Sequence, residues 1–320
     1  MKSTYLVAIF ILSQYASSGQ LRYYQHAVQS QVYENVGNTG ANGTSTIRTS
    51  YQRSSASSAK QGMLYYDKGI LLTNNDLLGY GVGAAFDQAG ESDFRNASIG
   101  LMGAYHRVLN ANENHSQHLS FGGSMMLHNR SLNTEGLRWP SQISPSTGFD
   151  PTKDPGSSAS GDFSTHYLAF DIGLTYAYYY KRNQYMKLGV ALHDFNQPNM
   201  SFYQYSDVPL MPSWVFSALG QFQVYKALYL EPSIRYFSSS YVSLFSVSNN
   251  FKYQLNNHSS ILLGMGYFDN GSIFGTVGAE LGRCRAMVTY GSSTDKVFKY
   301  KLLELGVAIT LDRGLASVAK

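Results

Sequence analysis

The chain has 320 residues, of which only 14% are charged, and it contains 26 Tyr, 30 Gly and a single Cys. Ordinary soluble domains carry about 25% charged residues, so this chain lacks the surface charge that a soluble protein of its size needs. The net charge of +4 is unclustered and does not indicate a nucleic-acid partner. A single cysteine excludes an intramolecular disulfide, and the sequence has no Cys/His spacing of a metal site.

The first predicted element is a signal peptide over residues 1–19. A Lys precedes a run of about eight apolar residues, and a small-residue stretch follows, with cleavage expected after Gly19. The apolar run is too short to span a bilayer as a helix, and no other stretch approaches 18 consecutive apolar residues. We therefore expect an exported protein without a transmembrane helix, in which residues 20–45 form an N-terminal segment facing the periplasm.

From residue 46 onward the chain divides into segments of roughly 8–13 residues, separated by turn-forming residues. Apolar and small or polar residues alternate along many of these segments, which is the period of a β-strand. The predicted strands are 46–53, 60–68, 78–87, 97–108, 118–129, 167–180, 185–194, 213–224, 227–237, 241–253, 259–268, 272–281, 284–290 and 300–311.

The last strand shows the alternation most clearly. In LLELGVAITL (302–311), Leu303 and Leu305 fall on one side, and Glu304 falls on the other. Strands in globular proteins average five to six residues, whereas a tilted membrane strand needs about 9–11. Many of the predicted strands also begin or end in aromatic residues, as in YAYYY (176–180), which is typical of the girdles at a membrane interface.

The predicted connections give independent support. Those after even-numbered strands are mostly short, with exceptions at 69–77 and 109–117, whereas the two longest, 130–166 and 195–212, follow odd-numbered strands. Bacterial outer-membrane barrels have short periplasmic turns and longer extracellular loops. We therefore predict an all-β fold, a transmembrane outer-membrane antiparallel β-barrel of about 14 strands over residues 46–311, followed by a tail at 312–320. Lipid is expected on the Leu303 face and the lumen on the Glu304 face.

The sequence carries no nucleophile, metalloprotease, phosphate-loop or Cys/His motif, so neither an enzyme nor a cofactor is expected. Several charged residues on the predicted strands are candidates for the lumen. These are Asp87, Lys187, Glu231, Arg235, Glu280 and Glu304. Two interpretations remain open: a network that holds the barrel shape, or a selectivity ring of a pore.

The two longest loops are the candidate surfaces for a partner, because loops of this length are usually functional or disordered. Loop 130–166 either enters the lumen or reaches outward. The candidate partner-binding residues of the two loops are Trp139, Phe149, Phe195, Gln197, Pro198, Asn199 and Phe202.

Several segments resemble the PorP/SprF family of the type IX secretion system of Bacteroidetes. The expected start of the mature chain, QLRYYQHAVQSQVYENVGNTG (20–40), is similar in spacing to the first segment of that family. LGVALHDFNQPNMSF (188–202) is the most similar stretch, because a strand ending in His and a following Gln-Pro-Asn are typical there. ALYLEPSIRY (227–236) and VTYGSSTDKVFKYKLLELGVAI (288–309) fit as well.

This resemblance implies a non-enzymatic outer-membrane component that works with other secretion components. It implies export or surface anchoring of large secreted proteins, including gliding adhesins. The expected partners are outer-membrane lipid and the secreted cargo. A passive or substrate-selective porin is the main alternative, and an outer-membrane hydrolase is a third possibility that the absence of a catalytic triad disfavours.

Overall fold

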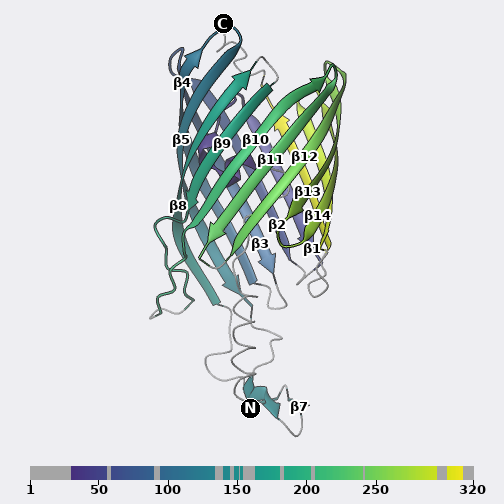
Figure 1. Ribbon diagram of the computed structural model, residues 1–320. Coiled ribbons are helices and arrows are strands. Elements are labelled where there is room, and N and C mark those ends of the chain that lie inside the picture. Colours follow the sequence, from purple (N-terminus) through teal and green to yellow (C-terminus); the bar gives the residue numbers. More distant parts are fainter. Residues whose placement is uncertain are drawn as a thin grey trace.

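The computed structural model describes residues 30–55, 59–89, 94–133, 140–144, 148–150, 152–153, 163–180, 184–202, 206–240, 242–293 and 301–312. The predicted signal peptide lies outside the described residues, as does the tail beyond Asp312. Fourteen strands form a closed barrel, in which each strand is antiparallel to its neighbours and β1 closes onto β16 (Figure 1).

The barrel strands are β1 Thr46–Ser54, β2 Lys60–Leu71, β3 Asp76–Ala89, β4 Phe94–Ala111, β5 His115–Leu132, β8 Phe163–Tyr180, β9 Gln184–His193, β10 Ser213–Tyr225, β11 Leu228–Ser239, β12 Ser243–Asn256, β13 Ser259–Phe268, β14 Ser272–Leu281, β15 Cys284–Ser293 and β16 Lys301–Thr310. Each of the fourteen predicted strands corresponds to one of these, so the predicted fold class is confirmed. Most differences are extensions at strand ends, because the ladder continues through the turn-forming residues that flank the periodic core of each strand.

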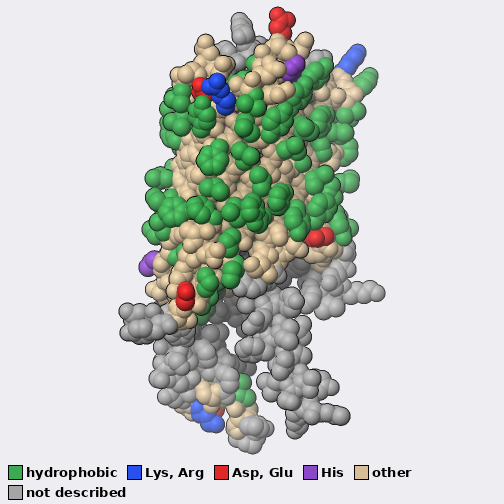
Figure 2. Space-filling view, turned by 60° about the vertical axis from the view of Figure 1, so that its left-hand side comes forward, with side chains coloured by type: hydrophobic (Ala, Val, Ile, Leu, Met, Phe, Trp, Pro, Cys, Tyr) green, Lys and Arg blue, Asp and Glu red, His purple; other side chains and the backbone are tan. Residues whose placement is uncertain are grey.

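The two faces of the barrel wall differ as the alternation predicts. On β16, Leu303 and Leu305 are 45% and 44% exposed, whereas Glu304 between them is fully buried. Figure 2 shows that hydrophobic side chains cover the outer wall over its middle height, while the charged side chains in this view lie toward the two ends. An apolar outer band with polar groups turned inward is the inverse of a soluble β-barrel and suits a barrel surrounded by lipid.

The two ends of the barrel are different. At one end, all strand connections are two to four residues long: 72–75, 112–114, 181–183, 226–227, 257–258 and 282–283. The two connections that the sequence predicted to be longer, 69–77 and 109–117, are only 72–75 and 112–114 in the structure. They are shorter because β2 to β5 extend further than their alternation indicates. We call this the short-turn end, and the opposite end, which carries connections 133–162 and 194–212, the long-loop end.

The wall is taller on one side. β4, β5 and β8 each span 18 residues, whereas β13 to β16 span 10. Between β5 and β8 the chain forms a separate small sheet of β6 (Ile143–Ser144) and β7 (Gly148–Phe149), preceded by the short helix η2 (Pro140–Gln142). Figure 1 shows β7 beyond the long-loop end, so the described part of this connection reaches outward.

The other helices among the described residues precede β1. They are the one-turn helix α2 (Gln31–Glu34) and the 3-10 helix η1 (Val36–Asn38). Within the described ranges, no helix is long and apolar enough to cross a membrane.

Candidate functional site

Residues 30–45, which we call the plug segment, lie inside the barrel (Figure 1). η1 contacts the inner faces of β4, β5, β8 and β9, and nearly all residues from Ser30 to Gly40 are buried. The sequence predicted residues 20–45 as a segment facing the periplasm; the part that the structure describes fills space within the ring of strands. It reaches the short-turn end at Ser45, directly before β1.

A buried ion pair joins the plug segment to β11 of the wall. Arg235 Nη1 of β11 donates to Glu34 Oε1 at 2.6 Å, and the two side chains are 0% and 4% exposed. Ser30 Oγ also donates to Glu34 Oε1, at 2.6 Å. A buried carboxylate requires this kind of partner, because an isolated charge is costly in a medium of low dielectric constant.

Asn35 fixes the turn between the two helices and bonds to the wall. Its Nδ2 donates to the main-chain oxygens of Leu174 on β8 and Val190 on β9, at 3.0 and 3.3 Å. Its Oδ1 accepts from Gly37 N at 2.9 Å and so caps η1. The Asn35 side chain therefore makes hydrogen bonds with main-chain groups of both the plug segment and the wall. Buried polar groups need such partners, so these bonds allow a polar segment to stay buried.

Two inward-facing histidines hold main-chain carbonyls of the plug segment. His106 Nε2 lies 2.7 Å from Thr39 O, while its Nδ1 lies 2.7 Å from Ser120 Oγ. His193 Nε2 lies 3.0 Å from Glu34 O. On the other side, Asp67 accepts from Gly40 N at 2.8 Å and pairs with Arg48.

The wall is shaped to admit the plug segment closely. A Cβ at Gly79 would lie 1.8 Å from the carbonyl oxygen of Thr39, and a Cβ at Gly122 would lie 2.6 Å from that of Val36. Both distances involve main-chain atoms, which cannot move aside as a flexible side chain does. Only glycine fits these two wall positions while the segment is in place.

The plug segment is also fixed at the short-turn rim. Asp312 Oδ1 accepts from Ser45 N and its Oδ2 accepts from Ser45 Oγ, both at 2.7 Å. These hydrogen bonds favour the ionised carboxylate and lower the pKa of Asp312. Ser45 directly precedes β1 and Asp312 follows β16, so this contact joins the first and the last strand of the barrel at the short-turn end.

The predicted lumen charges lie on inward-facing positions and most have polar partners. Lys187 donates to Gln31 of the plug segment at 3.3 Å, and Glu304 accepts from Ser50 at 3.0 Å. Asp87 is half-buried on β3. Lys187 and Arg235 therefore bind the plug segment, a role that the sequence did not indicate.

Glu231 and Glu280 belong to a second cluster. Arg285 donates to Glu231 at 2.5 Å and to Glu280 at 2.8 Å, and Lys252 also pairs with Glu280. The two carboxylates and the two basic groups of this cluster carry no net charge together. Their ion pairs join β11, β12, β14 and β15 on the lumen face.

The sequence did not indicate the contacts between the plug segment and the wall, which Glu34 and Asn35 make from the segment and Asp67, His106 and His193 make from the wall. The only signal was indirect. Arg235 on an inward-facing strand position needs a counter-charge, and Glu34 is an isolated acid in a segment of low charge.

In the loop 194–212 at the long-loop end, the described residues 194–202 and 206–212 are joined by several hydrogen bonds. Asn199 Oδ1 accepts from Ser201 N and Val208 N, and Gln197 N donates to Asp194 O. Asp194 and Gln197 have positive φ angles of 55° and 47°. The predicted residues Pro198 and Asn199 therefore pair with the later part of the loop, since Leu210 N donates to Pro198 O and Asn199 forms a β-bridge with Pro209.

Phe195 and Phe202 of this loop point to different places. Phe195 is exposed, and its ring lies 6.1 Å from that of Phe170 on β8. Phe202 contacts Phe94 and Phe163, and the Arg130 guanidinium lies 4.8 Å from the ring centre of Phe94 and 5.5 Å from that of Phe202. This aromatic cluster ties the loop to the first residues of β4 and β8.

Of the two candidates in the other long loop, the structure describes only Phe149. Phe149 is 37% exposed on β7, and Trp139 lies outside the described residues. Within 194–212 the structure thus places Gln197 in a turn with Asp194, Pro198 and Asn199 against the later part of the loop, Phe202 in the aromatic cluster, and Phe195 beside Phe170. Across the part of the chain that the structure describes, no cluster of His, Cys, Asp and Glu could hold a metal ion.

Comparisons with known proteins agree with the barrel. Residues 16–303 match the family described as "Type IX secretion system membrane protein PorP/SprF". No curated protein matches the chain. Among solved structures, the Pseudomonas putida toluene transporter TodX is 10% identical, with 90% of this chain and 93% of TodX covered and a TM-score of 0.50.

Two further solved barrels are less similar in shape. A Pseudomonas aeruginosa FadL homologue is 11% identical, with 84% of this chain and 90% of that protein covered and a TM-score of 0.46. The KdgM porin in complex with disordered oligogalacturonate is 8% identical, with 83% and 99% covered and a TM-score of 0.38. At these identities the likeness concerns the outer-membrane barrel fold alone.

Proposed function

Because the chain belongs to the PorP/SprF family of type IX secretion system membrane proteins, we propose that it recognises secreted cargo proteins at the outer membrane and takes part in their export or surface anchoring. Bacterial outer-membrane barrels place their short turns in the periplasm, so the long-loop end faces the cell exterior. The extracellular surface there, formed by 194–212 and the extended ends of β4, β5 and β8, is the proposed recognition site. Gliding adhesins are one class of cargo that this role would serve.

The plug segment argues against a passive porin. An open pore needs a continuous water-filled lumen, whereas residues 30–45 occupy the lumen and bond to at least five wall strands. A protein that acts through recognition at its outer surface needs no open channel through its wall.

The observation that carries the proposal is the exposed edge of β8. β5 pairs with β8 along all of Phe163–Tyr180, but β9 pairs only with Ile172–Tyr180. The loop covers the next part of the edge: Phe195 N donates to Phe170 O, and the Asn196 side chain bonds to Phe170 N and Leu168 O. The protein's own loop thus already uses this edge as a template for main-chain pairing.

The edge continues beyond the reach of the loop. Along a strand, the N–H and C=O groups of every second residue point to the same side. The N–H and C=O groups of Ser164 and His166 therefore point to the same side as the Leu168 carbonyl, which the loop binds. Both residues are exposed, and among the described residues none bonds to these groups. An unpaired edge accepts an extended strand of another protein, and a β-rich secreted domain offers such strands.

Affinity purification of the tagged protein from detergent-solubilised outer membranes tests the function. We expect type IX secretion components and one large secreted protein to be recovered with it. If the intact barrel is recovered alone and conducts ions in planar bilayers, the porin becomes the better assignment.

The recovered secreted protein then serves as the probe for the edge. H166P removes an N–H to which no described residue bonds, and proline is tolerated on edge strands. H166A keeps the main chain and removes only the side chain. We expect H166P to weaken binding of the purified cargo by about tenfold or more, since it removes one hydrogen bond and obstructs the ladder, while H166A binds as the wild type does. Equal binding by both variants would place the recognition site elsewhere on the outer surface.

A further inference from the structure

A row of basic residues lies on the outward face of the barrel at the long-loop end. The row consists of Arg53, Lys60, Arg95 and Lys301. Arg53 on β1 is the register partner of Lys60 on β2, and Gln88 on β3 lies between Lys60 and Arg95 of β4. The four residues therefore follow one line across neighbouring strands at the rim of the wall.

Lys301 extends this basic row onto β16. Arg53 is the register partner of Leu303, which is two residues from Lys301 on the same face. That face is the outward one, because Tyr51 and Leu303 at neighbouring outward positions are 38% and 45% exposed. Three adjacent strands thus place Arg53, Lys60 and Lys301 at outward positions of the same end of the wall, at the boundary of the apolar band.

The pairing of Arg53 with Lys60 is unfavourable without a further partner. Directly opposed residues of an antiparallel pair have Cβ atoms about 5 Å apart, and like charges at that spacing repel each other. None of the register partners that flank this pair is acidic. The inward-facing Arg48, Arg235 and Arg285 each pair with a carboxylate, which is the arrangement that buried cations require. An anion bound between the outward cations removes the repulsion.

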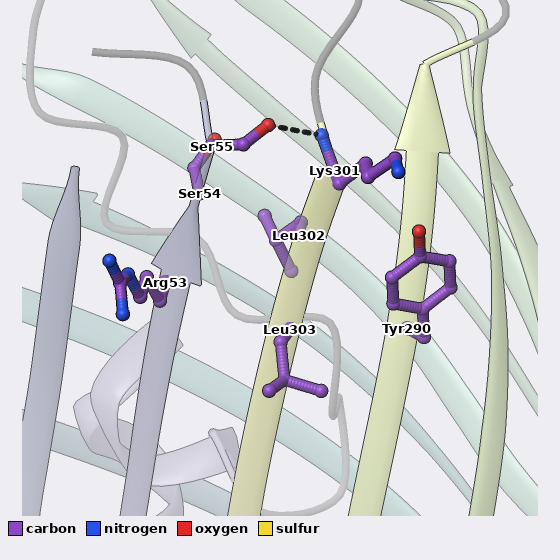
Figure 3. A pocket seen from close by; sticks show the side chains of 7 residues that line it. All are labelled: Arg53, Ser54, Ser55, Tyr290, Lys301, Leu302 and Leu303. Carbon is purple, nitrogen blue, oxygen red and sulfur yellow. Dashed lines mark hydrogen bonds between the residues drawn. The ribbon is translucent and has the colours of Figure 1, made fainter. Parts of the chain in front are cut away.

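A pocket lies beside these cations where the barrel closes, as Figure 3 shows. It has a volume of about 390 Å³ and is lined by Arg53, Ser54, Ser55, Tyr290, Lys301, Leu302 and Leu303. Ser55 Oγ accepts from Lys301 N at 2.8 Å and so holds the ends of β1 and β16 together. Cations and hydroxyl groups lie at the rim, while Leu303 and Tyr290 continue toward the apolar band.

We propose that the basic row and this pocket bind the phosphate group of an anionic lipid of the outer leaflet. The phosphate lies between Arg53, Lys60 and Lys301, where charge-assisted hydrogen bonds to phosphate are strong. The hydrocarbon of the lipid lies against Leu303 and Tyr290. The site does not depend on cargo recognition; it requires only that the long-loop end faces the cell exterior. Its consequence is that one side of the barrel, β16 to β4, is held in a fixed relation to the outer leaflet.

Native mass spectrometry of the full chain in detergent micelles tests the proposal. The probes are lipid A, which carries phosphates on a glucosamine backbone, and the same lipid after removal of its phosphates. We expect the wild type to bind the phosphorylated lipid at least tenfold more tightly. R53Q/K60Q should abolish that preference, whereas R107Q/K226Q, which removes the same charge at the short-turn end, should keep it. Heat-modifiable electrophoretic mobility checks that each variant forms a barrel.

Several results would overturn the proposal. Equal binding of the two lipids by the wild type would show that phosphate is not recognised. Retention of the preference in R53Q/K60Q would place the phosphate elsewhere. Complete displacement of the lipid by millimolar inorganic phosphate would show an anion site to which the hydrocarbon contributes nothing.

Discussion

Glu34 of the plug segment and Arg235 of β11 form a buried ion pair between residues 201 positions apart in the chain, with 2.6 Å between Oε1 and Nη1. Both side chains are buried, so removal of either one would leave the other charge in the protein interior without this ion pair, at a large cost in folding free energy. This pair and the hydrogen bonds of Asn35, His106 and His193 hold the plug segment in the lumen.

Removal of one partner should loosen the plug segment. In E34A the buried Arg235 loses the carboxylate with which it pairs, and breaking a buried ion pair by removing one partner costs about 3–5 kcal/mol. We expect E34A to show more frequent ion-conducting events than the wild type in planar lipid bilayers. The double variant E34A/R235A removes both charges and should conduct less than E34A. If E34A is as silent as the wild type, the ion pair does not hold the lumen closed.

The closeness of Gly79 to Thr39 gives a steric test of the same closure. A valine at position 79 would place its Cβ 1.8 Å from the Thr39 carbonyl oxygen, so the plug segment must move away. We expect G79V to raise the conductance in bilayers and the rate of proteolysis within residues 30–45. G103V is the matched control, because Gly103 faces outward and its nearest atom to an added Cβ is 3.7 Å away. An increase of equal size in G103V would point to general weakening of the barrel.

The barrel was predictable from the sequence because its signal is local. Alternation along a strand reports which residues face lipid, and Leu303, Glu304 and Leu305 carry that signal within three positions. Strand order also followed, since consecutive strands pair in an antiparallel barrel. Both ends of β4 and β5 and the first end of β8 were missed by three or four residues, because they extend past the apolar band, where alternation no longer distinguishes the two faces.

The plug segment was not predictable in the same way. Residues 30–45 are mostly polar or small and show no sustained period of two or 3.6. Their burial depends on hydrogen bonds to strands far along the chain, such as Asn35 with Leu174 and Val190, and no local pattern reports such pairs. Arg235 and Lys187 were identified as lumen charges, but a charged residue on a strand does not indicate which segment supplies its partner.

Arg130 should stabilise the position of the loop 194–212 at the long-loop end of the barrel. Its guanidinium contacts the rings of Phe94 and Phe202, and Nη1 donates to Met200 O at 3.4 Å. Cation–π contacts contribute about 0.5–2 kcal/mol each, so R130A should speed limited proteolysis within the loop several-fold. V208A truncates an exposed side chain of the same loop and should leave the rate unchanged. Equal cleavage rates for R130A and the wild type would mean that the hydrogen bonds within the loop suffice to order it.

The contact between Asp312 and Ser45 should make the rim of the plug segment sensitive to acid. Asp312 accepts two hydrogen bonds from Ser45, and these lower its pKa below the ordinary value of 3.8. A carboxyl group whose pKa is lower in the folded state contributes stability above its unfolded value and loses it as the pH falls through the folded value. Hydrogen-exchange protection of the Ser45 amide, corrected for the intrinsic rate, should therefore be full near neutral pH and decline below about pH 4. In D312N the side chain does not ionise, so we expect weaker protection that is flat over the same pH range. A decline of equal steepness in D312N would assign the acid sensitivity to another group.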